Sequence, residues 1–468
     1  MTKAESWAGA ASIVLLCSFQ TCVGQTVDHS HGKPGFELYT VRPNDTLFGI
    51  ASQYLQEPVD WMRLKRINGV SNPRDLKSFR VLRVPAELVR HDPLTAHVVA
   101  LRGVAERGAA GGPFSPLQPG VPLTEGDQIR TGDDSSLSIL LSDGSNLVLP
   151  SNSTMELRQL HEVPMTGAIH RKLELQKGEV ETGVTPLRRP GDTFEIISPS
   201  IIASVRGTHF RVQYIEASKA TAVEVTGGTV AVERPVQSKR DSGPGPSQHT
   251  EPLDMQFVHA GFGNVTGVAD SVGAPVRLLP APELNEPGRV QNQAQLIFNV
   301  RPLADAVAYR VQIARDAGFL ELLGDRRSTP PQIRFDELAD GLYFVRFSAI
   351  DQRGLEGLAQ TYGFERRKMG TISPTGDPLS HDGAYEFRWM SDTGELTTGE
   401  PTTRYRFVLS TSPDLAARIL DVADIVQTRL TVSHLQPGRY YWTVTAEQFE
   451  NGKYYSRTSA VESFVIGQ

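Results

Sequence analysis

Residues 38–85 read LYTVRPNDTLFGIASQYLQEPVDWMRLKRINGVSNPRDLKSFRVLRVP, and this stretch decides how the N-terminal part of the chain folds. Its first residues are strand formers, and Pro43 ends the strand because proline fixes φ and has no backbone donor. A helix is expected directly afterwards, with Asp45 as its N-cap. The apolar stripe of this helix falls at i, i+3, i+4 and i+7 and consists of Leu47, Ile50, Ala51 and Tyr54.

A second short helix is expected after Pro58, which restarts the periodicity. Asn68-Gly69 should end it, because these two residue types best tolerate positive φ. Residues 80–84 then read as a second strand. A β-α-α-β unit of this size can bury only a small core, so two facing helical stripes and a two-stranded ribbon are its minimum. The stripe of the second helix consists of Trp61, Leu64 and Ile67.

The segment resembles the LysM family along its whole length. Two positions depart from the family pattern: Asn44 stands where Gly is usual, and Phe48 where Trp is common. Both are compatible with the fold, since Asn also visits positive φ and Phe keeps an aromatic face. The resemblance is carried by Tyr39-Thr40-Val41, Asn44-Asp45-Thr46-Leu47, Ile50-Ala51, Ile67-Asn68, Pro73 and Val84-Pro85.

The resemblance implies binding of N-acetylglucosamine glycans, chiefly peptidoglycan, in a shallow groove between the first strand-helix loop and the second helix-strand loop. Short loops rich in Asn, Gly and Thr can provide backbone hydrogen-bond donors and acceptors for the acetamido group. Leu47 and Val70 can form an apolar wall for its methyl. The alternative is that the same residues only cap helices and turn the chain. This alternative is strongest for Asp45 and Gly69, because each already has a structural role. The groove would be lined by Asn44, Asp45, Thr46, Leu47 and Phe48 on one side and by Asn68, Gly69, Val70 and Ser71 on the other.

The chain of 468 residues is long enough for several domains, and its 39% hydrophobic and 21% charged residues are ordinary for globular protein. Its net charge of −6 argues against a nucleic-acid or anionic-membrane partner. Residues 1–24 read as a cleaved signal peptide, with an uncleaved anchor or lipidation at Cys22 as alternatives. No later apolar run is long enough to span a membrane, so the mature chain is expected to have no transmembrane segment.

Period-two alternation dominates from about residue 95 and predicts an all-β domain over residues 95–235. Residues 137–141 and 147–149 flank the turn Ser142-Asp143-Gly144-Ser145 as a hairpin. A second hairpin is expected at residues 225–232, turned by Gly227-Gly228. Further strands are expected around residues 173–175, 180, 194–196, 210–214 and 223–225.

This domain resembles the FecR family. The best-known members of that family relay a signal from an outer-membrane receptor to a sigma factor through one membrane span. That span and a cytoplasmic helix are missing from the pattern, so the resemblance implies an extracytoplasmic interaction module. It rests on Leu123, Gly126-Asp127, Ile129, Thr131-Gly132, Asp143-Gly144-Ser145, Ser198-Pro199-Ser200, Val205-Arg206-Gly207-Thr208, Phe210-Arg211-Val212 and the 225–232 hairpin.

Residues 236–282 read as a linker and connecting strands, and an internal repeat follows at 283–368 and 369–468. Tyr309, Val311, Ile313 and Phe319 recur 96 residues later, and a second set recurs after 97. Each copy contains Leu-x-x-Gly-x-Tyr, and the two copies resemble fibronectin type III-like sandwiches with a tyrosine corner. The second set pairs Ile333, Phe335, Leu338, Gly341, Tyr343, Val345 and Phe347 with Leu430, Val432, Leu435, Gly438, Tyr440, Trp442 and Val444.

The sequence contains only weak candidates for catalytic or metal-binding residues. His29-x-His31 fits a solvated tail better than a metal site, and Asp241-Ser242-Gly243 lies in linker sequence without the rigid partners of a nucleophile. Glu179 and Glu181 share one strand face and cannot flank a glycosidic bond, so a solvated face is expected there.

The sequence therefore predicts a mainly β, multidomain, non-catalytic protein of the periplasm or cell envelope. No cofactor, catalytic residue or metal ligand is expected. The expected partners are peptidoglycan or another N-acetylglucosamine glycan and an unidentified envelope protein, with no nucleic acid. The alternative is an envelope-sensing, FecR-type signalling component, and an envelope hydrolase has no assembled acid, base or nucleophile to support it.

Overall fold

The computed structural model describes residues 35–467, except 75, 110–111, 190, 236–253, 288–289, 294, 337, 368–371, 376–377, 382, 392–402 and 451. The chain divides into two compact units, Met1–Val89 and Arg90–Gln468. The expected signal peptide, Cys22, His29-x-His31 and Asp241-Ser242-Gly243 lie outside the described residues. Among the residues described, no helix is both long and apolar enough to cross a membrane.

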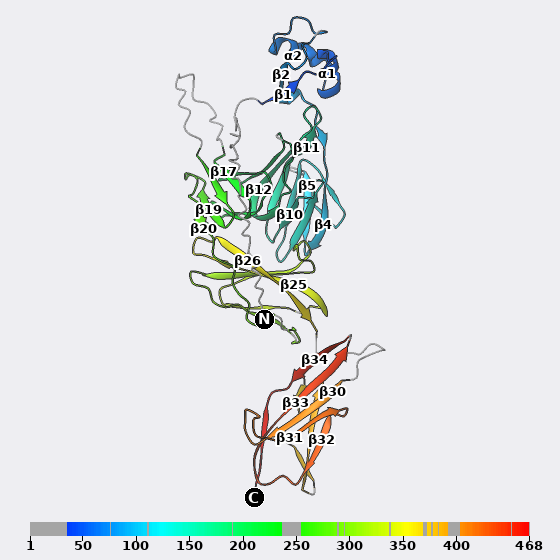
Figure 1. Ribbon diagram of the computed structural model, residues 1–468, viewed down its shortest axis with the longest axis vertical. Coiled ribbons are helices and arrows are strands. Elements are labelled where there is room, and N and C mark those ends of the chain that lie inside the picture. Colours follow the sequence, from blue (N-terminus) through cyan, green and yellow to red (C-terminus); the bar gives the residue numbers. More distant parts are fainter. Residues whose placement is uncertain are drawn as a thin grey trace, which may run out of the picture. The chain divides into compact units, whose positions relative to one another are not determined.

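The first unit has the expected β-α-α-β order (Figure 1). β1 and β2 pair antiparallel, with Tyr39 opposite Leu82. The stripe of the first helix is confirmed, because Leu47, Ile50, Ala51 and Tyr54 are all buried. The elements are β1 (Phe36–Thr40), α1 (Leu47–Tyr54), the 3-10 helix η1 (Pro58–Asp60), α2 (Trp61–Ile67), β2 (Val81–Pro85) and the 3-10 helix η2 (Ala86–Leu88).

Two details of this unit differ from the prediction. Thr46, not Asp45, is the N-cap of α1, and its hydroxyl accepts a hydrogen bond from the Gly49 N–H at 3.0 Å. In α2 only Leu64 is buried. Trp61 and Ile67 stay half-buried because they are the first and last residues of this seven-residue helix. The end of α2 is as predicted, with Asn68 as C-cap and Gly69 at φ +56°.

Strands β3 to β20 form a closed barrel around one apolar core. Their bounds are β3 (Asp92–Pro93), β4 (Ala96–Arg102), β5 (Ala105–Ala109), β6 (Ser115–Pro116), β7 (Pro122–Leu123), β8 (Asp127–Thr131), β9 (Ser136–Leu141), β10 (Asn146–Leu149), β11 (Thr154–Val163), β12 (Ala168–Gly183), β13 (Thr193–Ile197), β14 (Ile202–Val205), β15 (His209–Ile215), β16 (Ala220–Gly227), β17 (Thr229–Glu233), β18 (Met255–His259), β19 (Phe262–Gly267) and β20 (Val276–Arg277).

The long strand β12 belongs to two hydrogen-bonded layers of this barrel. Its first part pairs with β11 and β13, and its last part, residues 178–183, pairs with β15. The change occurs at Gly178, which has φ +78°. A Cβ there would lie 2.6 Å from the Asn152 carbonyl oxygen, so only glycine fits where the strand passes from one layer to the other.

The hairpin β9–β10 is confirmed, with Leu147 opposite Ile139 and Gly144 at φ +87°. The prediction of a second hairpin at residues 225–232 is wrong. β16 pairs with β15 and β19, and β17 pairs with β14 and β18, so both edges of each strand are already occupied. Gly228, at φ +83°, instead carries the chain from one layer to the other. β18 to β20, expected as connecting strands, complete the barrel.

The repeat consists of two β-sandwiches, here called repeat 1 and repeat 2. Both predicted tyrosine corners are present: the Tyr343 hydroxyl donates to the Ala339 carbonyl at 3.0 Å, and the Tyr440 hydroxyl to the Gln436 carbonyl at 2.7 Å. Phe319 and Leu415, which the repeat aligns, both have positive φ. The strand order β23-β22-β25-β26 in repeat 1 matches β31-β30-β33-β34 in repeat 2.

The strands of repeat 1 are β21 (Leu296–Asn299), β22 (Ala308–Ala314), β23 (Leu322–Ser328), β24 (Gln332–Phe335), β25 (Gly341–Ile350) and β26 (Glu356–Arg366). Those of repeat 2 are β27 (Ile372–Pro374), β28 (Leu379–His381), β29 (Ala384–Ser391), β30 (Arg404–Ser410), β31 (Arg418–Ile425), β32 (Arg429–Ser433), β33 (Gly438–Glu450), β34 (Lys453–Thr458) and β35 (Glu462–Ile466). Their cores are separate apolar clusters, so each copy is a sandwich in its own right.

Candidate functional site

The loop between β1 and α1 is shaped by its own side chains. Asn44 has φ +71°, the conformation that the family pattern fills with Gly. The Asp45 carboxylate accepts hydrogen bonds from the Arg42 N–H at 2.7 Å and from the Tyr39 hydroxyl at 2.8 Å. Burial and the Asp45 carboxylate both raise the pKa of Tyr39, so this phenol keeps its proton and remains a donor. The Asp45 side chain therefore holds the loop to β1, which explains why the cap falls to Thr46.

The loop after α2 is anchored by Asn68. The Asn68 amide donates to the carbonyl oxygens of Leu64 at 3.0 Å and Arg83 at 2.9 Å, and its side-chain oxygen accepts from the Arg83 N–H at 2.8 Å. These contacts tie α2 to β2, so the side chain of Asn68 has a structural role. The two loops meet where the Leu47 N–H donates to the Pro73 carbonyl at 3.0 Å.

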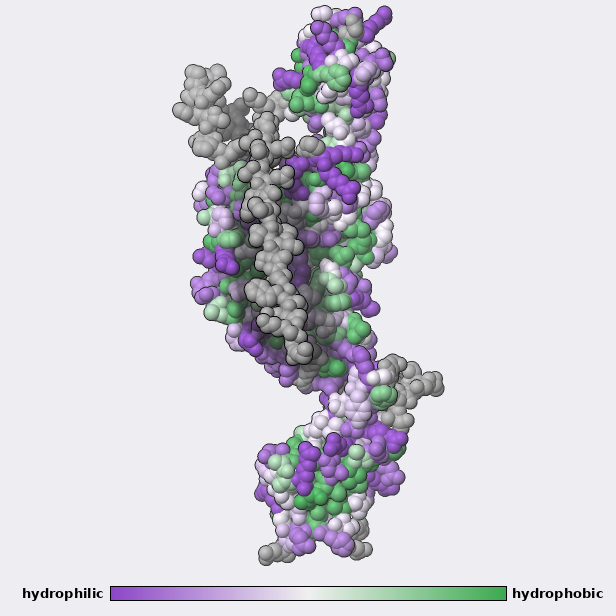
Figure 2. Space-filling model, viewed as in Figure 1, coloured by the Kyte–Doolittle hydropathy of each residue, from purple (hydrophilic) through white to green (hydrophobic). Residues whose placement is uncertain are grey.

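The predicted groove residues divide by exposure. Leu47 is fully buried and Val70 is buried, so their side chains belong to the core and cannot form the apolar wall expected of them. Asn44, Gly69 and Ser71 are exposed, and Phe48 exposes 58% of its surface. In Figure 2, hydrophobic residues appear among hydrophilic ones on the surface of this unit. Phe48 is therefore the predicted residue best able to offer an apolar face to a ligand.

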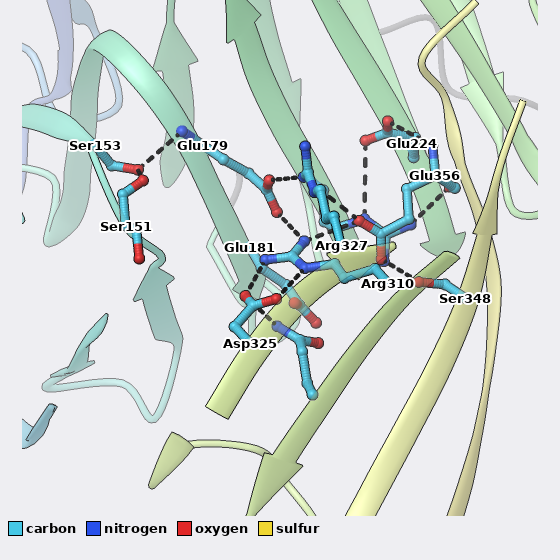
Figure 3. A network of polar contacts seen from close by, with 12 residues as sticks. Ser151, Ser153, Glu179, Glu181, Glu224, Arg310, Asp325, Arg327, Ser348 and Glu356 are labelled. Atoms are coloured by element: carbon cyan, nitrogen blue, oxygen red, sulfur yellow. Dashed lines mark hydrogen bonds and ion pairs between the residues drawn. The ribbon is translucent and has the colours of Figure 1, made fainter. Parts of the chain in front are cut away.

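A second polar site, which the sequence did not reveal, lies between the barrel and repeat 1. We call it the interface network; Figure 3 shows most of it. Arg310 on β22 donates to Glu179 of β12 at 2.5 Å and to Glu356 of β26 at 2.8 Å, and it forms a two-pronged pair with Asp325 at 2.8 and 2.5 Å. The network comprises Glu179, Glu181, Arg211, Glu224, Arg310, Asp325, Arg327, Arg346 and Glu356.

Glu179 and Glu181 were expected to lie on a solvated face, and that expectation is wrong. Glu179 is buried and also pairs with Arg327 at 2.7 Å, while both oxygens of Glu181 pair with Arg346 at 2.8 Å. The reason is tertiary, since repeat 1 covers this face of β12. One feature that could have indicated a covered face is a row of alternating charge across neighbouring strands. In this row Glu181 lies opposite Arg211, and Arg211 lies opposite Glu224.

Guanidinium groups decide the ionisation of most carboxyls in this network. Burial alone would raise the pKa of Glu356, but Arg211 and Arg310 outweigh it and hold that pKa well below its ordinary value. Burial would likewise raise the pKa of Glu181, but Arg346, Arg211 and Arg310 together outweigh it and lower that pKa. Across the described part of the chain, no three His, Cys, Asp or Glu side chains are placed to hold a metal ion.

Two segments match known protein families. Residues 39–85 match the LysM domain, and residues 127–231 match the FecR protein family. The chain therefore contains a LysM domain and a FecR-family domain, as predicted from the sequence. LysM indicates glycan binding and FecR an envelope-sensing component, and both are binding or signalling domains rather than catalytic ones.

Several solved structures resemble parts of the chain. One, described as an anti-sigma factor from Parabacteroides distasonis, has 18% identity and a TM-score of 0.24; the match covers 32% of this chain and 59% of that one. The FN1-FN3 domains of chicken CNTN1 have 15% identity and a TM-score of 0.22, over 55% of this chain and 98% of theirs. The fibronectin(III)-like modules of Clostridium thermocellum CbhA have 10% identity and a TM-score of 0.20, over 39% and 90%. No curated protein matches the chain.

Proposed function

We propose that this is a non-catalytic protein of the bacterial periplasm or cell envelope that binds N-acetylglucosamine glycans, chiefly peptidoglycan, through residues 36–87. The LysM match supports the ligand class. The observation that carries the site is the exposed Phe48 ring on the first turn of α1, beside a loop fixed by Asp45 and Thr46. An aromatic face on a rigid scaffold can cover the apolar face of a sugar ring.

In this proposal the FecR-family barrel and the two sandwiches present a surface to an envelope protein. The FecR match favours one alternative, an envelope-sensing signalling component. The two functions differ in what must happen to residues 1–24, because a relay needs an anchor in the inner membrane. Intact-mass measurement on protein from the native envelope distinguishes them: a mass without residues 1–24 favours the tether, and a mass that retains them favours the relay.

Co-sedimentation with purified peptidoglycan tests the glycan site. In the full chain, Phe48→Ala should weaken binding on the order of tenfold, since burying an aromatic side chain is worth about 1.5 kcal/mol or more. Met62→Ala is the matched control, because Met62 on α2 exposes 53% of its surface and is not part of the predicted groove. N-acetylglucosamine oligomers should release the wild-type protein from the pellet.

The choice of Phe48 avoids a confusion between binding and folding. Replacing Asn68 would remove the hydrogen bonds that join α2 to β2, and replacing Thr46 would remove a helix cap. Loss of binding in those variants would say little about the groove. The proposal fails if Phe48→Ala and Met62→Ala sediment with peptidoglycan as well as the wild-type chain does.

A further inference from the structure

The interface network contains five carboxyl groups and four guanidinium groups. The carboxyls belong to Glu179, Glu181, Glu224, Asp325 and Glu356, and the guanidiniums to Arg211, Arg310, Arg327 and Arg346. An unpaired charge inside a protein costs far more free energy than a neutral polar group in the same place. The network is therefore balanced in charge only when one of the five carboxyls carries a proton.

Glu224 is the carboxyl without a close cation. Its nearest guanidinium nitrogen is Nε of Arg211, 3.9 Å from Oε2, whereas the other four carboxyls each have a guanidinium nitrogen at 2.8 Å or less. The remaining nitrogens of Arg211 are engaged by the Glu356 carboxylate at 3.0 Å and by backbone carbonyls at 2.7 and 3.0 Å. Oε2 of Glu224 is buried and has no hydrogen-bond partner among the described residues.

The surroundings of Glu224 favour its neutral form. Glu224 lies on β16, where it faces Arg211 of β15, Glu179 of β12 and Glu356 of β26. The Glu356 N–H donates to Oε1 of Glu224 at 3.2 Å. On β19 the residue opposite is Gly263, which brings no charge. Burial, reinforced by the Glu356 and Glu179 carboxylates, outweighs Arg211 and raises the pKa of Glu224 to about 8.

We propose that the contact between the FecR-family barrel and repeat 1 is locked by a single proton on Glu224, and that loss of this proton loosens repeat 1 from the β12–β15–β16 face of the barrel. Deprotonation leaves a fifth negative charge in the contact with no cation to pair it. Separation of the two surfaces would return that charge to water.

The direction of the pH dependence follows from the raised pKa. In the unfolded chain Glu224 titrates near the ordinary value of 4.5, and in the folded chain near 8. The stabilisation by the bound proton is therefore complete below pH of about 4.5 and disappears as the pH rises through about 8. The lock is thus closed in neutral surroundings and opens in mildly alkaline ones.

Hydrogen exchange followed by mass spectrometry on the full chain tests the proposal. The segment to follow is β26, which contains the Glu356 amide bonded to Glu224. After correction for base-catalysed exchange, protection of β26 in the wild type should fall as the pH rises through about 8. Glu224→Gln, which keeps the neutral form at every pH, should show no such loss.

Asp421→Asn in repeat 2 provides the control. It removes an ionised carboxylate that pairs with Arg406 outside the interface network, so the charge balance of the network is unchanged and the alkaline loss of protection in β26 should remain. Equal alkaline losses in wild type and Glu224→Gln would overturn the proposal.

A second measurement does not depend on the variant folding. Infrared difference spectra of the wild type should show a protonated carboxylic acid at neutral pH that disappears near pH of about 8. Absence of that band would equally overturn the proposal.

Discussion

Replacement of Arg310 by methionine tests how much the interface network stabilises the protein. Arg310 has only 3% of its side chain exposed and contacts three carboxylates, those of Glu179, Asp325 and Glu356. Methionine fills similar space but leaves these carboxylates without their shared cation. Removing one partner of a buried ion pair costs about 3–5 kcal/mol. At about 2–4 °C per kcal/mol for a unit of this size, the melting temperature of the barrel and repeat 1 should fall on the order of 10 °C.

The internal repeat supplies a matched control for this variant. Arg406, at the position of Arg310 in repeat 2, forms the same two-pronged pair with Asp421 at 2.7 and 2.8 Å. Its side chain is 44% exposed, so Arg406→Met should leave the melting temperature of repeat 2 unchanged, as expected for surface ion pairs.

Differential scanning calorimetry is the assay, because the tryptophans at 7, 61, 389 and 442 all lie outside the barrel and repeat 1. Tryptophan fluorescence reports repeat 2 through Trp389 and Trp442, together with the LysM domain through Trp61, and is silent on the barrel and repeat 1. Equal shifts in the two variants would refute the claim that burial in the interface, rather than the Arg-Asp pair itself, provides the stabilisation.

Two further predictions concern local stability. Thr46→Ala should lower the free energy of unfolding of the LysM domain by about 1 kcal/mol, because the Gly49 N–H loses its cap, and urea denaturation followed by Trp61 fluorescence measures this. Tyr343→Phe and Tyr440→Phe should each cost about 1 kcal/mol in their own repeat, because each removes one hydroxyl-to-carbonyl hydrogen bond; the calorimetric transition of the other repeat should not move.

Positions that face a core were predictable from the sequence because burial leaves a local, periodic pattern. The stripe of α1 and the hairpin around Gly144 follow from such patterns and are found as predicted. The N-cap was missed by one residue, since Asp45 and Thr46 are both good caps and only the fold shows that Asp45 is held by Tyr39. In the candidate groove, Leu47 was predicted both for the buried stripe of α1 and for the groove wall, and only the fold shows that its side chain lies in the core while Phe48 stays outside.

Outward faces were harder to predict, because a charged residue on a strand looks the same whether water or another domain covers it. The two repeats make this concrete. Gln312 and Arg346 lie opposite each other in repeat 1, and Arg346 reaches Glu181 of the barrel.

The same two register positions in repeat 2 hold Val408 and Thr443, which offer no charge to a neighbour. The two copies therefore have equivalent core positions and the same Arg-Asp pair, but they differ in the residues that can contact an acidic surface. The repeated pattern lies in the core positions, so it predicted two equivalent sandwiches and could not show that Arg346 of the first contacts Glu181 of the barrel.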